Sequence, residues 1–229
     1  METLSTTETY ISNLITMINA FGDPWGLKSP NSEHIYMNKE ARRFTATPDQ
    51  FDLEGRRDGE FPADWAEMEA DLIAHDQRTC HSGKASLVIE THHWYGSTDI
   101  IPYLGEKYPV CDEQGNCIAI LWYAKPVLNI DPLLLINRKM PGIISTTPGC
   151  TLFTPAEYET LFYLLRGLSA KDIARINNVS HKTIGNRVQA IFQKADVHSF
   201  RQLEEFCRVN HITDYIPPHL LKKGLISVR

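Results

Sequence analysis

The C-terminal third of the sequence is constrained most by helix-start signals that follow one another at short intervals. Thr154-Pro155-Ala156-Glu157 has the pattern of a capping box, with proline at the first helical position, where its missing N–H costs nothing. The segments 169–172 and 199–202 each repeat a serine followed three positions later by a side-chain acceptor. A further helix is expected after Ser180. Four short helices with tight turns predict a small all-α bundle that contains a helix-turn-helix.

The helix expected from His181 to Lys194 has two contrasting faces. Its apolar residues share one face, which must pack on the other helices: Ile184, Val188, Ile191, Phe192 and Ala195. Amide side chains can read base edges, whereas hydroxyls and cations bind phosphates. We therefore expect Asn186 and Gln189 to contact bases, and a second group to contact phosphates: Ser180, Lys182, Thr183, Arg187 and Lys194.

The charge distribution indicates that the binding partner is double-stranded DNA. The net charge is −5, but residues 1–149 hold 12 Lys and Arg against 21 Asp and Glu, whereas residues 150–229 hold 11 against 7. No acidic residue lies between Asp172 and Asp196. A solvated surface helix without a binding role would normally mix Glu with Lys. A basic segment inside an acidic protein is typical of a phosphate-binding surface.

The part of the chain before residue 141 mixes helix and strand patterns. Helices are expected at 8–20, 39–44 (with Asn38 as the cap) and 64–79. Strands are expected at 25–28, 34–37, 85–95, 98–110 and 117–127. The last two strands are joined by the hairpin turn 112–116, in which Gly115 can take a positive φ. These elements predict a small α+β domain.

The order of motifs in this α+β part resembles a PAS domain over about residues 20–127. The motifs are Pro24-Trp-Gly-Leu-Lys28, Ile35-Tyr-Met-Asn38, Phe51-Asp-Leu-Glu-Gly55 and Tyr108-Pro-Val-Cys-Asp-Glu-Gln-Gly-Asn116. They are similar to the PAS sensors of certain enterobacterial LuxR-type regulators that lack a partner synthase. The resemblance implies a sensor whose cavity is lined by aromatic side chains and takes a small apolar or aromatic ligand, although no residue can be assigned to that ligand from the sequence.

The C-terminal bundle resembles the LuxR/NarL family of DNA-binding domains. The matching motifs are Thr154-Pro-x-Glu157-x-Glu159, Leu165-x-Gly167-Leu-Ser169-x-Lys-Asp-Ile-Ala174, Val179-Ser-x-Lys-Thr-Ile184, Asn186, and Ile191-x-x-Lys194-x-x-Val197. Two positions depart from the family pattern. Arg187 stands where His is usual, and Gly185 stands where a long polar side chain is common, so the target sequence cannot be taken from relatives.

These observations predict a fold of the α+β class with a PAS-like sensor domain and an all-α four-helix LuxR-type domain. The expected boundaries are an N-terminal amphipathic helix at 1–19, the sensor at 20–128, a linker at 129–150, the DNA-binding domain at 151–211 and a tail at 212–229. The resemblance implies a sequence-specific transcription regulator that acts as a homodimer on two half-sites. The odd number of cysteines favours a cytoplasmic location. The alternatives are a regulator that uses its sensor only for protein contacts and a PAS sensor that binds haem or flavin.

Other chemistry is poorly supported by the sequence. Phosphate-loop, zinc-protease and nucleophile-elbow motifs are missing, so no enzyme activity, catalytic residue or cofactor is assigned. His92 and His93 point to opposite faces of a strand and are not expected to share a metal. His75, Asp76 and His81 are interpreted as a solvated helix end. The five cysteines indicate neither a disulfide framework nor a zinc site, and no membrane-spanning run or secretion signal is found.

Overall fold

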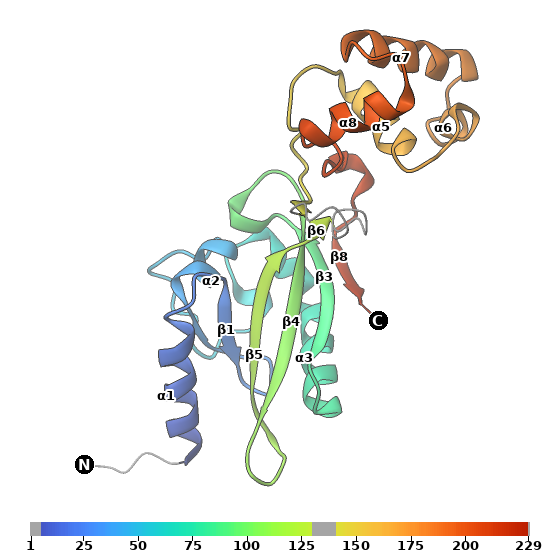
Figure 1. Ribbon diagram of the computed structural model, residues 1–229. Coiled ribbons are helices and arrows are strands. Elements are labelled where there is room, and N and C mark those ends of the chain that lie inside the picture. The colour runs from blue at the N-terminus through green and yellow to red at the C-terminus, as the bar shows by residue number, and fades with distance from the viewer. Residues whose placement is uncertain (1–5, 130–140, 229) are drawn as a thin grey trace. The chain divides into compact units, whose positions relative to one another are not determined.

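The computed structural model describes residues 6–129 and 141–228, which fall into two compact units (Figure 1). The sheet unit comprises the chain up to Val127 together with Lys222 onward, and the helical unit comprises Leu128–Leu221. Residues 1–5 of the expected N-terminal segment and residues 130–140 of the expected linker lie outside the described residues.

The sheet unit is built on an antiparallel sheet with the strand order β2-β1-β5-β4-β3-β8. The strands are β1 Trp25–Lys28, β2 His34–Met37, β3 Ser86–His92, β4 Ile101–Cys111, β5 Cys117–Pro126 and β8 Gly224–Ser227. The five strands expected from the sequence are confirmed, with three of them shifted or shortened at their ends. Strand β8 was not expected: it comes from the C-terminal tail and pairs with β3. The hairpin turn is also confirmed, since Gly115 has a φ of 86°.

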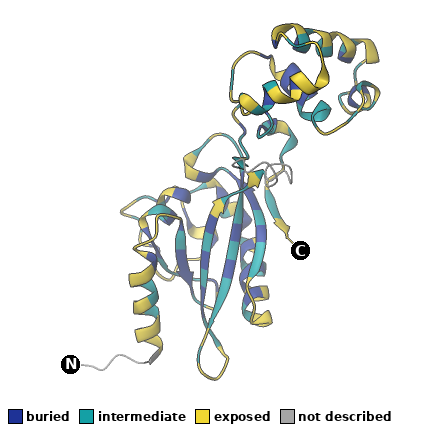
Figure 2. Cartoon of the chain, viewed as in Figure 1, coloured by how far each residue is buried: buried dark blue, intermediate teal, exposed yellow. Residues whose placement is uncertain are grey.

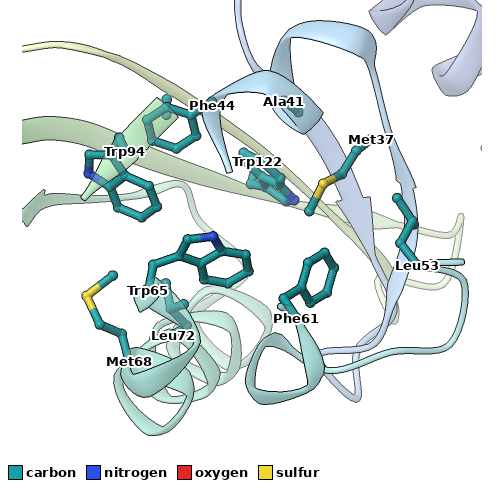
Figure 3. Packing of buried hydrophobic residues seen from close by; sticks show 11 residues of the cluster. Met37, Ala41, Phe44, Leu53, Phe61, Trp65, Met68, Leu72, Trp94 and Trp122 are labelled. Carbon is teal, nitrogen blue, oxygen red and sulfur yellow. The ribbon is translucent and has the colours of Figure 1, made fainter. Parts of the chain in front are cut away.

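One face of this sheet is covered by short helices that enclose an aromatic core (Figure 3). The elements are α2 Lys39–Phe44, the 3-10 turns Asp58–Glu60, Asp64–Met68 and Trp94–Gly96, and α3 Glu69–Ser82. The helix expected from Asp64 therefore begins as a 3-10 turn. Phe44 stacks on Trp94 with ring centroids 4.3 Å apart, and the Trp65 indole N–H donates to the Thr45 carbonyl at 2.8 Å. Fully buried aromatic rings of this size dominate the energetics of a core.

The other face of the sheet is covered by α1, Thr6–Ile18. Ile18 is fully buried against Leu27 and Ala119. Asn38 fastens the end of this helix to the sheet: its side-chain amide N–H donates to the Ile18 carbonyl at 3.0 Å, while its Oδ1 accepts from the Ala41 N–H at 2.8 Å and so caps α2. The predicted cap at Asn38 is thus confirmed.

Two expectations about this unit are wrong. Cys80 of α3 and Cys117 of β5 form a disulfide, with their Cα atoms 5.6 Å apart, although the sequence indicated no disulfide. The two cysteines meet only through the packing of α3 on the sheet, which their spacing does not reveal. The interpretation of His75 and Asp76 as solvated also fails, because both side chains are buried between α3 and the sheet.

The helical unit contains α5 Pro155–Leu164, α6 Ala170–Ile176, α7 His181–Lys194 and α8 Phe200–Val209, with a short pair β6 Leu128–Asn129 and β7 Gly142–Ile143 and a 3-10 turn Pro218–Leu220. Thr154 and Glu157 form the predicted reciprocal capping box. Ser169 and Ser199 cap α6 and α8 as expected, but the side chain of Gln202 accepts from the His198 N–H instead of completing the box at Ser199.

Candidate nucleic-acid interface and ligand cavity

Helices α6 and α7 form a helix-turn-helix that is held together by a small apolar cluster. Ile173 and Ala174 of α6 pack against Ile184 of α7, and Ile173 and Ile184 are completely buried. Asn178 in the turn has a φ of 51°, a left-handed conformation that asparagine tolerates better than most residues. The Ser180 hydroxyl then accepts from the Thr183 N–H at 3.0 Å and starts α7. The orientation of α7 is therefore fixed by its apolar face.

The opposite face of α7 lies open to solvent (Figure 2). The predicted contact residues Ser180, Lys182, Asn186 and Gln189 are exposed, and Thr183 and Arg187 are half-buried on its shoulders. An α-helix brings residues three and four apart onto one face, so Lys182, Asn186 and Gln189 form one stripe. Gly185 lies beside this stripe, and a Cβ atom there would meet no other atom within 4 Å. Packing therefore does not require glycine at this position, and a long side chain would fit here.

Lys194 differs from the other predicted contact residues. Its Nζ donates to Glu157 Oε2 at 2.6 Å, which joins the end of α7 to the capping box of α5. Burial alone would raise the pKa of the Glu157 carboxyl, but its hydrogen bonds with Lys194 and Thr154 outweigh burial and hold that pKa below its usual value. The ammonium that the sequence assigned to a phosphate already has a carboxylate partner within the helical unit.

The sheet unit contains a cavity between the sheet and the helices on its aromatic face. Counted as the space that the centre of a water molecule can reach, the cavity measures about 40 Å³. Part of its wall is aromatic: Phe44, Trp65, Trp94 and Trp122. Another part is ionisable: Lys28, His34, Asp58, Glu90 and Lys107. Trp65, Trp94, Trp122 and Tyr123 line this cavity, whereas Trp25 and Tyr36 pack on the α1 side of the sheet.

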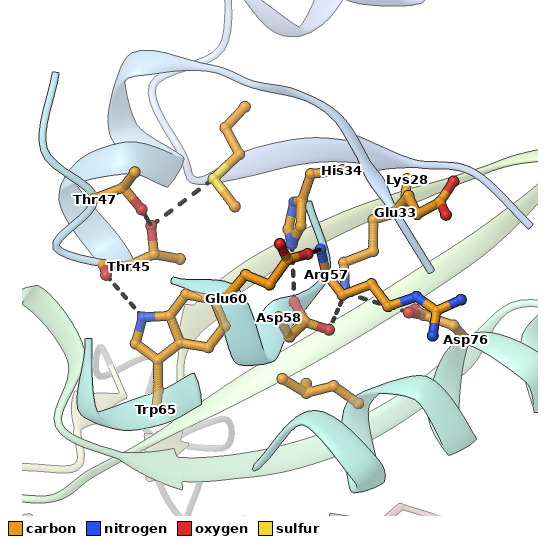
Figure 4. Close-up of polar contacts among 12 residues, drawn as sticks. Lys28, Glu33, His34, Thr45, Thr47, Arg57, Asp58, Glu60, Trp65 and Asp76 are labelled. Atoms are coloured by element: carbon orange, nitrogen blue, oxygen red, sulfur yellow. Dashed lines mark hydrogen bonds and ion pairs between the residues drawn. The ribbon is translucent and has the colours of Figure 1, made fainter. Parts of the chain in front are cut away.

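The ionisable wall is a network of buried ion pairs (Figure 4). Lys28 Nζ donates to Asp58 Oδ2 at 2.5 Å and to Asp76 Oδ2 at 3.2 Å, and Lys107 donates to the other oxygen of Asp76. Asp58 also contacts His34 Nε2 at 2.9 Å. Burial would lower the pKa of Lys28, but the two aspartates raise it above its usual value, so the ammonium stays charged.

Sequence reasoning missed this network, although one signal was available. Lys28 and Lys107 occupy strand positions whose side chains point to the same face as buried apolar residues. A lysine at such a position must find a carboxylate inside the protein, because an unpaired buried charge is too costly. His92 likewise points inward, where its Nε2 contacts Glu67 Oε1 at 2.7 Å. In residues 6–129 and 141–228, no group of three or more His, Cys, Asp or Glu side chains could hold a metal ion.

A helix-turn-helix with an exposed polar stripe, together with an α+β unit that contains a cavity, defines a DNA-binding regulator with a sensor domain. Residues 18–129 match the family model for the PAS fold, and residues 151–206 match the model for bacterial regulatory proteins of the luxR family. The chain therefore combines an N-terminal PAS domain with a C-terminal LuxR-type DNA-binding domain. The resemblances inferred from the sequence motifs are confirmed.

Solved structures of similar fold extend over nearly the whole chain. VqmA of Vibrio cholerae, in a complex with a ligand and DNA, has a TM-score of 0.75 at 23% identity, over 95% of this chain and 96% of that one. A phage VqmA in complex with DPO has a TM-score of 0.69, also at 23% identity, over 96% and 97%. At this identity the similarity establishes the fold. No curated protein sequence matches the chain.

None of the helices within the described residues has the combined length and apolar character of a membrane span.

Proposed function

We propose that this protein is a homodimeric, sequence-specific transcription regulator, which acts on cytoplasmic DNA without enzymatic activity and responds to a small molecule in its PAS cavity. The observation that carries the DNA-binding part is the exposed polar stripe on α7, whose position is fixed by the buried contacts of Ile184 and Ile191. Asn186 and Gln189 would pair with base edges, and Lys182, Thr183 and Arg187 would bind phosphates on either side. Ser180 would contribute its hydroxyl at the helix start.

The dimeric state follows from the small size of the recognition surface. One short helix contacts too few bases to select a site in a genome, and two half-sites read by a pair of helices solve this problem. The similar VqmA of Vibrio cholerae was solved in a complex with ligand and DNA. This supports the proposal that the present chain also binds both a ligand and DNA. We retain the domain boundaries expected from the sequence as part of this proposal, with the recognition function in 151–211.

The cavity favours a small ligand over the two alternatives. A regulator that uses its PAS domain only for protein contacts needs no internal space, whereas this domain keeps about 40 Å³ open beside ionisable groups. That space corresponds to about three water molecules. A haem or a flavin is several times larger and would require the aromatic core to open. Visible absorbance of the purified protein tests for such a cofactor, and native mass spectrometry tests for a small molecule.

Selection of binding sites from random DNA tests the function directly. The full chain is expected to enrich two inverted half-sites whose centres lie about one helical turn of DNA apart. Asn186→Ala should reduce discrimination at one or two positions in each half-site by about 1–3 kcal/mol, because an amide can pair with adenine through two hydrogen bonds. Gln77→Ala, which removes an exposed amide of α3, serves as the control. A site unchanged by Asn186→Ala, or no enriched site at all, would contradict the proposal.

A further inference from the structure

Glu90 occupies an unusual position in the wall of the cavity. It lies in the middle of β3 and is only 7% exposed. Its carboxyl group lies over Gly105 of the neighbouring strand, so closely that a Cβ atom on Gly105 would overlap it. The missing side chain at Gly105 therefore provides the space that this carboxyl group occupies.

The buried charges around the cavity balance one another without Glu90. The ammonium groups of Lys28 and Lys107 are matched by the carboxylates of Asp58 and Asp76. Burial and the nearby Lys28 lower the pKa of His34 to about 4, so this imidazole is neutral near pH 7. A charged Glu90 is thus an excess negative charge. Within the described part of the chain, no side chain or backbone group forms a hydrogen bond with its carboxyl group.

This excess charge creates a demand for a positive partner. Burial raises the pKa of Glu90 to about 7, against the opposing influence of Lys107 and Lys28, so the carboxyl gains or loses its charge in the neutral pH range. A buried carboxylate gains most from a partner that brings both a charge and N–H donors. The surrounding rings of Phe44, Trp65 and Trp94 favour the same kind of partner, because their faces attract cations.

A second polar group in the wall also lacks a partner. The indole N–H of Trp122, a residue of the cavity wall, is buried against Gly26 and forms no hydrogen bond with any described residue. Buried indole N–H groups normally find an acceptor. This N–H is closed off from the cavity, so the unused polar group that the wall offers to a ligand here is the acceptor at Glu90.

We propose that the PAS cavity binds a small organic cation, no larger than about one ring, whose charged N–H group pairs with the Glu90 carboxylate. This inference rests on the proposed sensing function and names the class of ligand. The size limit follows from the cavity volume. Glu90 is then the residue that distinguishes a cationic ligand from a neutral molecule of equal shape.

A matched pair of compounds tests this proposal on the full chain. Cyclopentylamine is an ammonium ion at pH 6–8, and cyclopentanol has the same carbon frame without the charge. Binding can be followed by tryptophan fluorescence, since Trp65, Trp94 and Trp122 line the cavity. At pH 8 the amine is expected to bind at least about tenfold more tightly than the alcohol. Its affinity should fall about tenfold between pH 8 and pH 6 as Glu90 takes up a proton.

Two variants distinguish the contribution of Glu90 to amine binding from that of other titratable groups. Glu90→Gln should abolish both the preference for the amine and its pH dependence, even though Lys107, whose pKa burial also lowers, is still present. Glu113→Gln, an exposed carboxyl in the β4–β5 hairpin, should retain both. If Glu90→Gln does not fold, an amine affinity of the unmodified protein that stays constant from pH 6 to pH 8 still overturns the role of Glu90.

The outcomes distinguish this proposal from the function on which it rests. Equal affinity for the amine and the alcohol, or an amine affinity that is constant from pH 6 to pH 8, overturns the role of Glu90 and leaves the cavity as a binding site for neutral molecules. Binding of neither compound overturns the cationic ligand class. The site selection on random DNA reports separately on the regulator itself.

Discussion

The two units of this protein use charged side chains in opposite ways. In the sheet unit, Lys28, Lys107, Asp58 and Asp76 are almost completely buried and pair with one another. In the helical unit, Lys182 is exposed on α7, and no ion pair to it occurs among the described residues. Buried charges must be satisfied inside the protein, whereas exposed charges remain available to a partner. Lysine is therefore part of the buried structure in one unit and is open to a partner in the other.

The largest expected effect is the loss of one carboxylate from the buried network. Asp76→Asn leaves Lys28 and Lys107 with too little negative charge, and removing one partner of a buried ion pair costs about 3–5 kcal/mol. The free energy of unfolding of the sheet unit should fall by this amount. Urea denaturation followed by tryptophan fluorescence measures it, because all four tryptophans of the chain lie between residues 25 and 122.

Asp71→Asn provides the control for this measurement, since Asp71 is an exposed carboxylate on the same helix. It should change the free energy of unfolding by less than about 1 kcal/mol. Equal effects of the two substitutions would show that the buried network contributes no more than a surface charge, and the contrast between the two units would disappear.

A smaller effect is expected from the unpaired carboxyl of Glu90. Its folded pKa of about 7 lies above the usual 4.5, so its stabilising contribution is present below pH 4.5 and is lost as the pH rises through 7. Between pH 5 and pH 8, the unmodified protein should therefore lose about 2–3 kcal/mol of unfolding free energy relative to Glu90→Gln. Urea denaturation of both proteins at the two pH values measures this difference. A constant difference would mean that Glu90 titrates as it does in water.

The smallest effects are expected from substituting two lysines of α7, and the two substitutions should affect different properties. Lys182→Ala should leave stability unchanged and reduce the slope of log affinity against log salt for DNA by about one, because one phosphate contact is lost. Lys194→Ala should instead increase hydrogen exchange of the α7 amides by an amount equivalent to about 1 kcal/mol, since it breaks the contact with Glu157. DNA binding at several salt concentrations and hydrogen exchange on the full chain measure the two effects. If Lys194→Ala also reduces the slope of log affinity against log salt, Lys194 contacts a phosphate of the DNA, as expected from the sequence.

The two units also differ in how much of their structure could be predicted from the sequence. The helical unit was predicted closely because its signals are local: a cap such as Ser180 and the periodic apolar residues that follow specify a helix without knowledge of distant residues. The disulfide between Cys80 and Cys117 and the pairing of Lys28 with Asp58 and Asp76 join segments that are far apart in the chain. Such contacts depend on the tertiary arrangement, which periodicity and spacing do not encode.

Strand β8 has a consequence for how the sheet unit is completed during synthesis. Its partner β3 is made before the entire helical unit, and the pairing of Val88 with Ser227 waits until nearly all of the described chain has left the ribosome. Until then β3 is an open edge strand, the kind of edge that associates readily with other strands. A fragment that ends in the linker, such as residues 1–145, retains this open edge permanently. Self-association of such a fragment would then report a missing strand and not the dimer interface of the intact regulator.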